Sequence, residues 1–185
     1  NFTPAMFPYW GKSRLFAAQP QDLISPQPLD YSTAESSEYY KQHKQLNDLV
    51  TNITAENRWI AEFWSDDIVG LTYSPPARLL AIANQMLVLE KMNLADGLHF
   101  YCKLGLAIND ASVAAWNSKY IYNTERPETY IRKYINPDFE SLLGEAIGKK
   151  GIEPPFPGYP SGHSTFGGIQ AGIFNDFFGI NYTFT

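Results

Sequence analysis

Apolar residues recur every three to four positions along most of the chain, which is the period of an α-helix with one buried face. The pattern predicts helices over residues 36–51, 55–67, 76–93 and 95–123. The last of these is expected either as one long helix or as two with a break near Gly105. No run alternates apolar and polar residues for long enough to predict a strand. The sequence therefore predicts an all-α fold, a helical bundle packed around an apolar core.

Proline and glycine divide the second part of the chain into shorter segments. The residue before a proline disfavours the right-handed helical conformation, so the long helix is expected to end ahead of Arg126-Pro127. Short helices are then predicted over residues 128–134, 136–150 and 164–178. Gly179 directly follows the last of them, as is typical of a residue that ends a helix.

Residues 1–30 differ from the rest, because they contain many prolines and show little periodicity. We expect them to form an irregular arm, and apolar side chains such as Phe7 and Trp10 indicate that it packs down on the surface. Residues 31–185 then form the helical domain. Because the chain stops abruptly after the residues NYTFT, we expect this domain to be the N-terminal part of a longer one.

Composition and charge exclude several classes of protein. Of the 185 residues, 44% are hydrophobic and 18% are charged, which is the balance of a globular domain and not of a disordered chain. The formal net charge of -5 argues against binding to nucleic acid or to an anionic lipid surface. No apolar run is suited to a transmembrane segment. An anionic small molecule would have to be held by a few local cations.

The single cysteine and two of the three histidines suggest structural roles. Cys102 has no partner for an intrachain disulfide or a thiolate metal site, and we expect it to be buried on a helix. His43 falls on a polar helical face and is expected to be solvated, whereas His99 lies in an apolar helix and is expected in the core. The wide spacing of the histidines predicts no metal cluster.

Lys119 and Arg126 are the first candidates for a functional site. They are seven positions apart, close to two helical turns, so a continuous helix would place both side chains on one face together with Trp116. Two cations on one stripe of an acidic protein indicate either a solvated face or a site for an anion. The adjoining Pro127 favours the anion site, because it fixes the chain direction where the guanidinium of Arg126 leaves the helix.

The run Pro160-Ser161-Gly162-His163 is the second candidate, because it precedes a predicted helix. Backbone N–H groups at a helix N-terminus bind anions, and Ser161 can both cap the helix and donate to a ligand oxygen. Gly162 permits a close approach of the backbone. His163 would lie in the first turn, where an imidazole can transfer protons near neutral pH. A turn with a structurally hydrogen-bonded histidine is the alternative.

The spacing KxxxxxxRP at Lys119 to Pro127, followed by PSGH, resembles the superfamily of vanadium-dependent haloperoxidases and type 2 phosphatidic acid phosphatases. The wider sequence is more similar to the haloperoxidase branch. In the chloroperoxidase type an aromatic residue precedes the lysine by three positions and a phenylalanine precedes the histidine by seven, and Trp116 and Phe156 occupy these positions here. The resemblance covers residues 60–178 and implies an all-helical bundle.

The resemblance implies roles for individual residues. Four of them would bind the oxygens of vanadate or phosphate: Lys119, Arg126, Ser161 and Gly162. His163 would be the acid–base group beside the apical oxygen, and Lys119 would also polarise a bound peroxide. Trp116 and Phe156 would shape the halide or substrate side of the pocket.

One part of the family pattern is missing. The third signature, SRxxxxxHxxxD, contains an arginine that binds the same anion and a histidine that bonds vanadium or attacks phosphorus, and no arginine or further histidine follows His163. No residue of this chain would therefore bond vanadium directly. We expect a C-terminal segment to supply both residues, and we expect activity only when it is present.

The resemblance leaves three functions open. The first is a haloperoxidase that uses vanadate, hydrogen peroxide and halide. The second is an acid phosphatase without a cofactor, which would hydrolyse phosphomonoesters or lipid phosphates through a phospho-histidine. The third is a helical module without catalysis. Such proteins are often exported in bacteria, so a periplasmic or secreted location is expected, while the halide, the substrate and the oligomeric state stay open.

Overall fold

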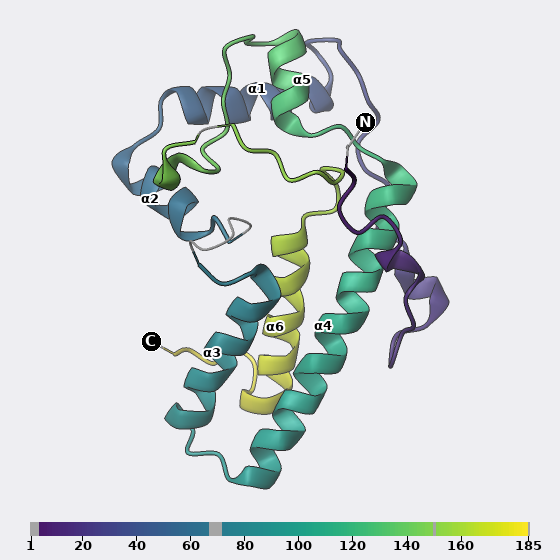
Figure 1. Ribbon diagram of the computed structural model, residues 1–185, viewed down its shortest axis with the longest axis vertical. Coiled ribbons are helices and arrows are strands. Elements are labelled where there is room, and N and C mark those ends of the chain that lie inside the picture. Colours follow the sequence, from purple (N-terminus) through teal and green to yellow (C-terminus); the bar gives the residue numbers. More distant parts are fainter. Residues whose placement is uncertain (1–3, 67–71, 150, 185) are drawn as a thin grey trace. The chain divides into compact units, whose positions relative to one another are not determined.

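The computed structural model describes residues 4–66, 72–149 and 151–184, and in this part of the chain it contains helices and turns but no strand (Figure 1). The α-helices are α1 (Glu38–Thr51), α2 (Ala55–Phe63), α3 (Pro75–Leu89), α4 (Leu94–Tyr122), α5 (Pro127–Tyr134) and α6 (Gly162–Phe178). Three short 3-10 helices are η1 (Trp10–Lys12), η2 (Pro20–Leu23) and η3 (Glu145–Ile147). The prediction of an all-α fold is confirmed.

The structure settles one open point about the predicted helices and corrects another. The long helix α4 continues through Gly105 without a break. The helix predicted over residues 136–150 is wrong, because the described part of this range contains turns and the three-residue helix η3. Gly144 and Gly148 have φ values of 90° and 71°, in the left-handed region that a right-handed helix does not enter. Residues 67 and 150, at the ends of two predicted helices, lie outside the described residues.

The chain forms two compact units. The first unit consists of Asn1–Met6, Pro26–Thr72 and Tyr122–Tyr159. The second unit consists of Phe7–Ser25, Tyr73–Ile121 and Pro160–Thr185. The division into an arm over residues 1–30 and a domain over residues 31–185 stays a prediction.

In the first unit α1 packs on α5 (Figure 1). Aromatic rings make this contact. Tyr130 of α5 is fully buried, and its ring centroid lies 5.1 Å from that of Tyr39 and 4.2 Å from that of His43, both on α1. The Tyr130 hydroxyl donates to the carbonyl oxygen of Ser32 at 2.6 Å, which satisfies its polar end. The expectation of a solvated His43 is therefore wrong, because the two tyrosine rings half-bury it.

The second unit has its core between α3, α4 and α6, which lie alongside one another (Figure 1). The buried residues of this core are Ala83, Met86, Phe100, Leu104 and Phe174.

Two expectations about α4 are wrong. His99 and Cys102 are both exposed, because Phe100 and Leu104 take the inward face of the helix. The His99 ring packs against the ring of Phe177 at 5.3 Å between centroids.

The N-terminal segment of the second unit packs on α4 through one buried carboxylate. Asp110 accepts hydrogen bonds from the backbone N–H groups of Phe16, Ala17 and Ala18 at 2.8, 2.7 and 2.7 Å. Burial of the carboxyl group would raise its pKa, but these backbone hydrogen bonds outweigh burial and lower the pKa of Asp110 to about 2. The carboxylate therefore fixes this part of the chain on α4.

A close backbone contact continues the same attachment. A Cβ atom on Gly11 would lie only 2.5 Å from Cα of Asn117, so only glycine fits at this position. The Asn117 amide and the Ser118 hydroxyl donate to the carbonyl oxygen of Leu23 at 3.1 and 3.0 Å, and Ser118 also accepts from the N–H of Ser25. Residues 11–25 therefore lie against the C-terminal half of α4.

We predict that Asp110→Asn destabilises the protein, because the amide carries no charge and offers one acceptor oxygen in place of two. The free energy of unfolding, measured by urea denaturation at neutral pH, should fall by about 2 kcal/mol, the linkage expected for a carboxyl whose pKa drops from its usual value to about 2.

The sign of the pH dependence follows from the lowered pKa. The contribution of Asp110 is complete above the pKa of the unfolded chain, so the parent protein should lose it between about pH 4 and pH 2, and Asp110→Asn should not. The control is Asp176→Asn, whose ion pair with Lys103 is exposed and screened by water. Equal losses in both variants would contradict the role of Asp110.

Candidate functional site

The second unit contains a buried cation beside an indole ring. Lys119 on α4 is 1% exposed, and its ammonium lies 5.9 Å from the ring centroid of Trp116, one turn earlier on the same helix. An ammonium is costly to remove from water, and the face of an indole offsets part of that cost. The charge of Lys119 is therefore buried on α4 beside an aromatic ring.

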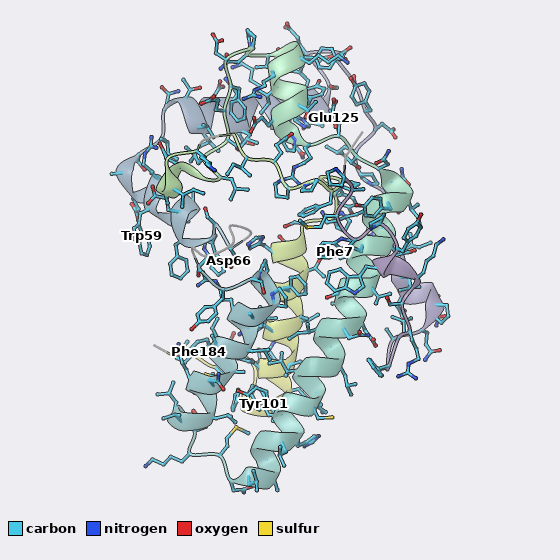
Figure 2. All side chains as sticks on the ribbon, viewed as in Figure 1. Phe7, Trp59, Asp66, Tyr101, Glu125 and Phe184 are labelled. Carbon is cyan, nitrogen blue, oxygen red and sulfur yellow. The ribbon has the colours of Figure 1, made fainter. Side chains whose placement is uncertain are left out.

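Aromatic rings from the N-terminal segment of the second unit cover Trp116. The ring centroid of Trp10 lies 4.7 Å from that of Trp116, and Phe7 lies 6.3 Å away (Figure 2). Phe7 and Trp10 also pack on each other, at 5.3 Å. The sequence showed these residues only as apolar positions in an irregular arm, and their contact with Trp116 had no local signal.

Helix α6 begins at Gly162, two residues before the predicted start at residue 164, and has the serine cap that the sequence allowed. Ser161 is the N-cap residue, with its side-chain oxygen accepting from the N–H of Ser164 at 3.2 Å. Thr165 donates its hydroxyl to the carbonyl oxygen of Ser161 at 2.8 Å. A serine hydroxyl has one donor and two acceptor positions, so the O–H of Ser161 is still able to donate to a ligand oxygen while the cap is made. His163 is the second residue of the helix and is half-buried.

The same indole ring meets the N-terminus of α6. A Cβ atom on Gly162 would lie 3.9 Å from Cη2 and Cζ3 of Trp116, an ordinary van der Waals distance. The Lys119 ammonium and the Gly162 backbone are therefore both near Trp116. The structure thus brings together three predicted site residues of the second unit.

The remaining two predicted residues meet in the first unit. The Nη1 of Arg126 donates to the carbonyl oxygen of Phe156 at 3.3 Å, and the guanidinium carbon lies 5.2 Å from the Phe156 ring centroid. The loop that carries Phe156 is anchored next to it, because the N–H of Gly158 donates to the carbonyl oxygen of Thr124 at 3.0 Å. Backbone and ring contacts thus orient the guanidinium.

The prediction that Lys119 and Arg126 share one helical face is wrong. Helix α4 ends at Tyr122, and Asn123 has a φ of 47°, a left-handed conformation that stops the helix. Arg126 is instead the N-cap residue of α5, with extended backbone angles of −74° and 146°. Its direction is therefore set by the turn and not by the helical period.

Sequence reasoning missed Glu153. Its Oε1 lies 3.7 Å from Nε of Arg126, and its Oε2 accepts from the hydroxyl of Thr129 at 3.1 Å. The only signal for it was an acidic residue directly ahead of the proline-rich run that ends at His163. The predicted oxyanion-binding guanidinium of Arg126 thus has a carboxylate beside it.

The predicted site residues therefore form two groups: Trp116, Lys119, Ser161, Gly162 and His163 in the second unit, and Arg126 and Phe156 in the first. That all of them bind one oxyanion stays a prediction. Across the described ranges, no group of three or more His, Cys, Asp or Glu side chains could hold a metal ion. None of the described helices combines the length and the hydropathy needed to cross a bilayer.

Known proteins resemble this chain in sequence and in structure. Residues 99–185 match the family model of the VCPO second helical-bundle domain. The chain is 26% identical over 186 residues to a vanadium chloroperoxidase of Curvularia inaequalis, with 87% of this chain covered. A crystal structure described as the first bacterial vanadium-dependent iodoperoxidase matches with a TM-score of 0.87 and 31% identity over 97% of this chain.

These relatives are longer proteins. The chain spans 30% of the chloroperoxidase and 44% of the iodoperoxidase chain. The matches confirm the predicted resemblance to the superfamily of vanadium haloperoxidases and type 2 phosphatidic acid phosphatases, and they confirm its helical fold.

We predict that Glu153→Gln strengthens the binding of a tetrahedral oxyanion such as phosphate. The carboxylate and the anion would compete for the Arg126 guanidinium, so removing the negative charge should raise the affinity about twofold to fivefold, as expected for a partly exposed ion pair. Isothermal titration with phosphate measures the change. The matched control is Glu140→Gln, an exposed carboxylate in the same unit. An affinity that falls or stays constant would show that Glu153 does not oppose the anion.

Proposed function

We propose that this chain, a relative of the vanadium haloperoxidases in sequence and fold, provides part of the oxyanion site of an enzyme that oxidises halide with hydrogen peroxide. The observation that supports this most strongly is the contact around Trp116. It brings the buried ammonium of Lys119 and the capped N-terminus of α6 at Gly162 to one ring, although these residues are far apart in the sequence.

The residues fit vanadate, and both relatives are named for vanadium. An ammonium, a serine hydroxyl and the N–H groups at a helix N-terminus are donors, as the oxygens of a vanadate anion require. The residues that would hold it are Lys119, Ser161 and Gly162 in the second unit and Arg126 in the first. When bound, vanadate supplies the centre at which peroxide is activated for attack by halide.

Each residue of the proposed site would have a distinct role. The ammonium of Lys119 would stabilise negative charge on an oxygen, and its burial strengthens that interaction because little water screens it. His163, in the first turn of α6, would accept or donate a proton at a ligand oxygen. The rings of Trp116 and Phe156 would exclude water from the halide side of the site.

Hydrolysis of a phosphate ester would use the same donors, with His163 protonating the leaving group. The reported relatives are named as peroxidases, so the comparisons favour the peroxidase. As part of the proposal, the protein acts outside the bacterial cytoplasm, which cell fractionation with an antibody would test.

The proposal is tested with the protein at its native length by following the halogenation of a dye with peroxide, halide and added vanadate. Halogenation that requires vanadate is the expected result. Release of phosphate from an aryl phosphate without any halogenation would identify a phosphatase instead. If neither vanadate nor phosphate binds, the non-catalytic role is the correct one.

We predict that Lys119→Met weakens vanadate binding by about 1.5–3 kcal/mol, the value of a charge-assisted hydrogen bond. Methionine keeps most of the length and volume of the side chain and removes the charge. Isothermal titration gives the affinity, and urea denaturation of the same sample shows whether the variant is folded. The proposed role of Lys119 would be wrong if the folded variant bound vanadate as tightly as the parent protein.

We predict that Gly162→Ala weakens vanadate binding about tenfold or more, because a Cβ atom would stand where the anion approaches the backbone. The protein itself leaves room for this atom, so the free energy of unfolding should change by less than about 1 kcal/mol. The control is Gly167→Ala on the same helix, where a Cβ atom meets open space. Equal affinities in both variants would place the anion elsewhere.

A further inference from the structure

Two tyrosines of the first unit share a hydrogen bond at the surface. Tyr31 precedes α1 and Tyr134 is the last residue of α5, and the Tyr31 hydroxyl donates to the Tyr134 hydroxyl at 2.8 Å. Tyr31 is 54% exposed and Tyr134 is half-buried. The Tyr134 ring packs on the buried ring of Tyr130 at 4.9 Å between centroids, which holds it in place. Neither hydroxyl belongs to the proposed oxyanion site.

The surroundings of the two hydroxyls are unequal. The ammonium of Lys133 lies 5.0 Å from the ring centroid of Tyr134. Hydrogen bonding by Lys133, and then by Tyr31, lowers the pKa of Tyr134, although burial and the carboxylate of Glu125 oppose this. The hydrogen bond to Tyr134 raises the pKa of Tyr31. Two donors thus stabilise negative charge on one phenol oxygen and not on the other.

This inequality has a chemical consequence. An electrophilic halogen attacks the ring of a phenol at the carbons ortho to the oxygen, and it attacks the phenolate much faster than the neutral phenol. The ring whose oxygen carries more negative charge therefore reacts faster with the electrophilic halogen. Exposure alone would favour Tyr31, whereas the arrangement of donors favours Tyr134.

We propose that Tyr134 is a modification site of this protein, where the ring carbon ortho to the hydroxyl takes up halogen from a hypohalous acid. A carbon–halogen bond forms as the oxygen–halogen bond breaks, the ring carbon loses its proton, and the oxygen leaves as water. The inference rests on the proposed function, because oxidation of halide by peroxide supplies the hypohalous acid. Hypohalous acid that diffuses out of the oxyanion site would then halogenate the protein at Tyr134 first.

The first test uses hypoiodous acid prepared separately and added below one equivalent to the folded protein at neutral pH. Mass spectrometry of proteolytic peptides gives the iodine content at each tyrosine. The Tyr134 peptide should contain more iodine than the Tyr31 peptide, and Tyr73, which is 59% exposed, serves as the internal reference for access of the reagent. An iodine content at Tyr31 equal to or above that at Tyr134 would overturn the proposal.

Two variants test the cause. Lys133→Gln removes the cation and should lower the iodine at Tyr134, relative to Tyr73, about twofold to fivefold, as expected for an exposed charge. Tyr31→Phe removes the other donor and should lower it as well. Unchanged iodination of Tyr134 in both variants would show that the donors do not activate the ring.

The second test separates this inference from the proposed function. The native protein receives vanadate, iodide and peroxide in place of prepared reagent. Iodination of Tyr134 in both experiments supports both statements. If Tyr134 is iodinated by the prepared reagent but not by the native protein with its substrates, the protein is not a source of hypohalous acid, and the reactivity of Tyr134 is still established. If the dye is halogenated while Tyr134 is unmodified, only the modification site is refuted.

Discussion

The buried ammonium of Lys119 is the constraint on which the proposed site depends. Removing such a charge from water costs several kcal/mol, so a structure that keeps it must surround it with groups that stabilise it. Trp116 supplies part of this, because the ammonium lies over its ring. The same ring then meets the N-terminus of α6 at Gly162. A positive charge and a helix N-terminus each favour a nearby anion, and here both lie near the ring of Trp116.

Asp110, on the same helix, shows how a buried charge is stabilised when it is structural. Three backbone N–H groups donate to its carboxylate, and they fix residues 16–18 on α4. The attachment continues through the close contact of Gly11 with Asn117. This positions Trp10 on the ring of Trp116. The N-terminal segment of the second unit therefore covers the ring that lies beside Lys119.

Local patterns predicted much of this structure, and tertiary contacts account for the rest. The period of apolar residues predicted α3 and α4, and the serine and glycine ahead of α6 predicted its capped N-terminus. The pattern gave a false helix over residues 136–150, because it carries no information on the positive φ of Gly144. The burial of His43 depends on rings from two helices, and the ion pair of Glu153 joins residues distant in sequence. Neither contact has a signature in the local sequence.

The spacing of Lys119 and Arg126 has a different physical meaning from the one that the helical period suggested. Seven residues of continuous α-helix rise about 10 Å, which would hold two parallel side chains too far apart to share a small oxyanion. The structure ends α4 at Tyr122 and turns the chain at Asn123, so Arg126 projects from the start of another helix. In this chain the stretch KxxxxxxRP therefore spans a helix end and a turn, and the proline is the first residue of α5. The direction of Arg126 is therefore set by the turn at Asn123 and by the start of α5, and the period of α4 has no part in it.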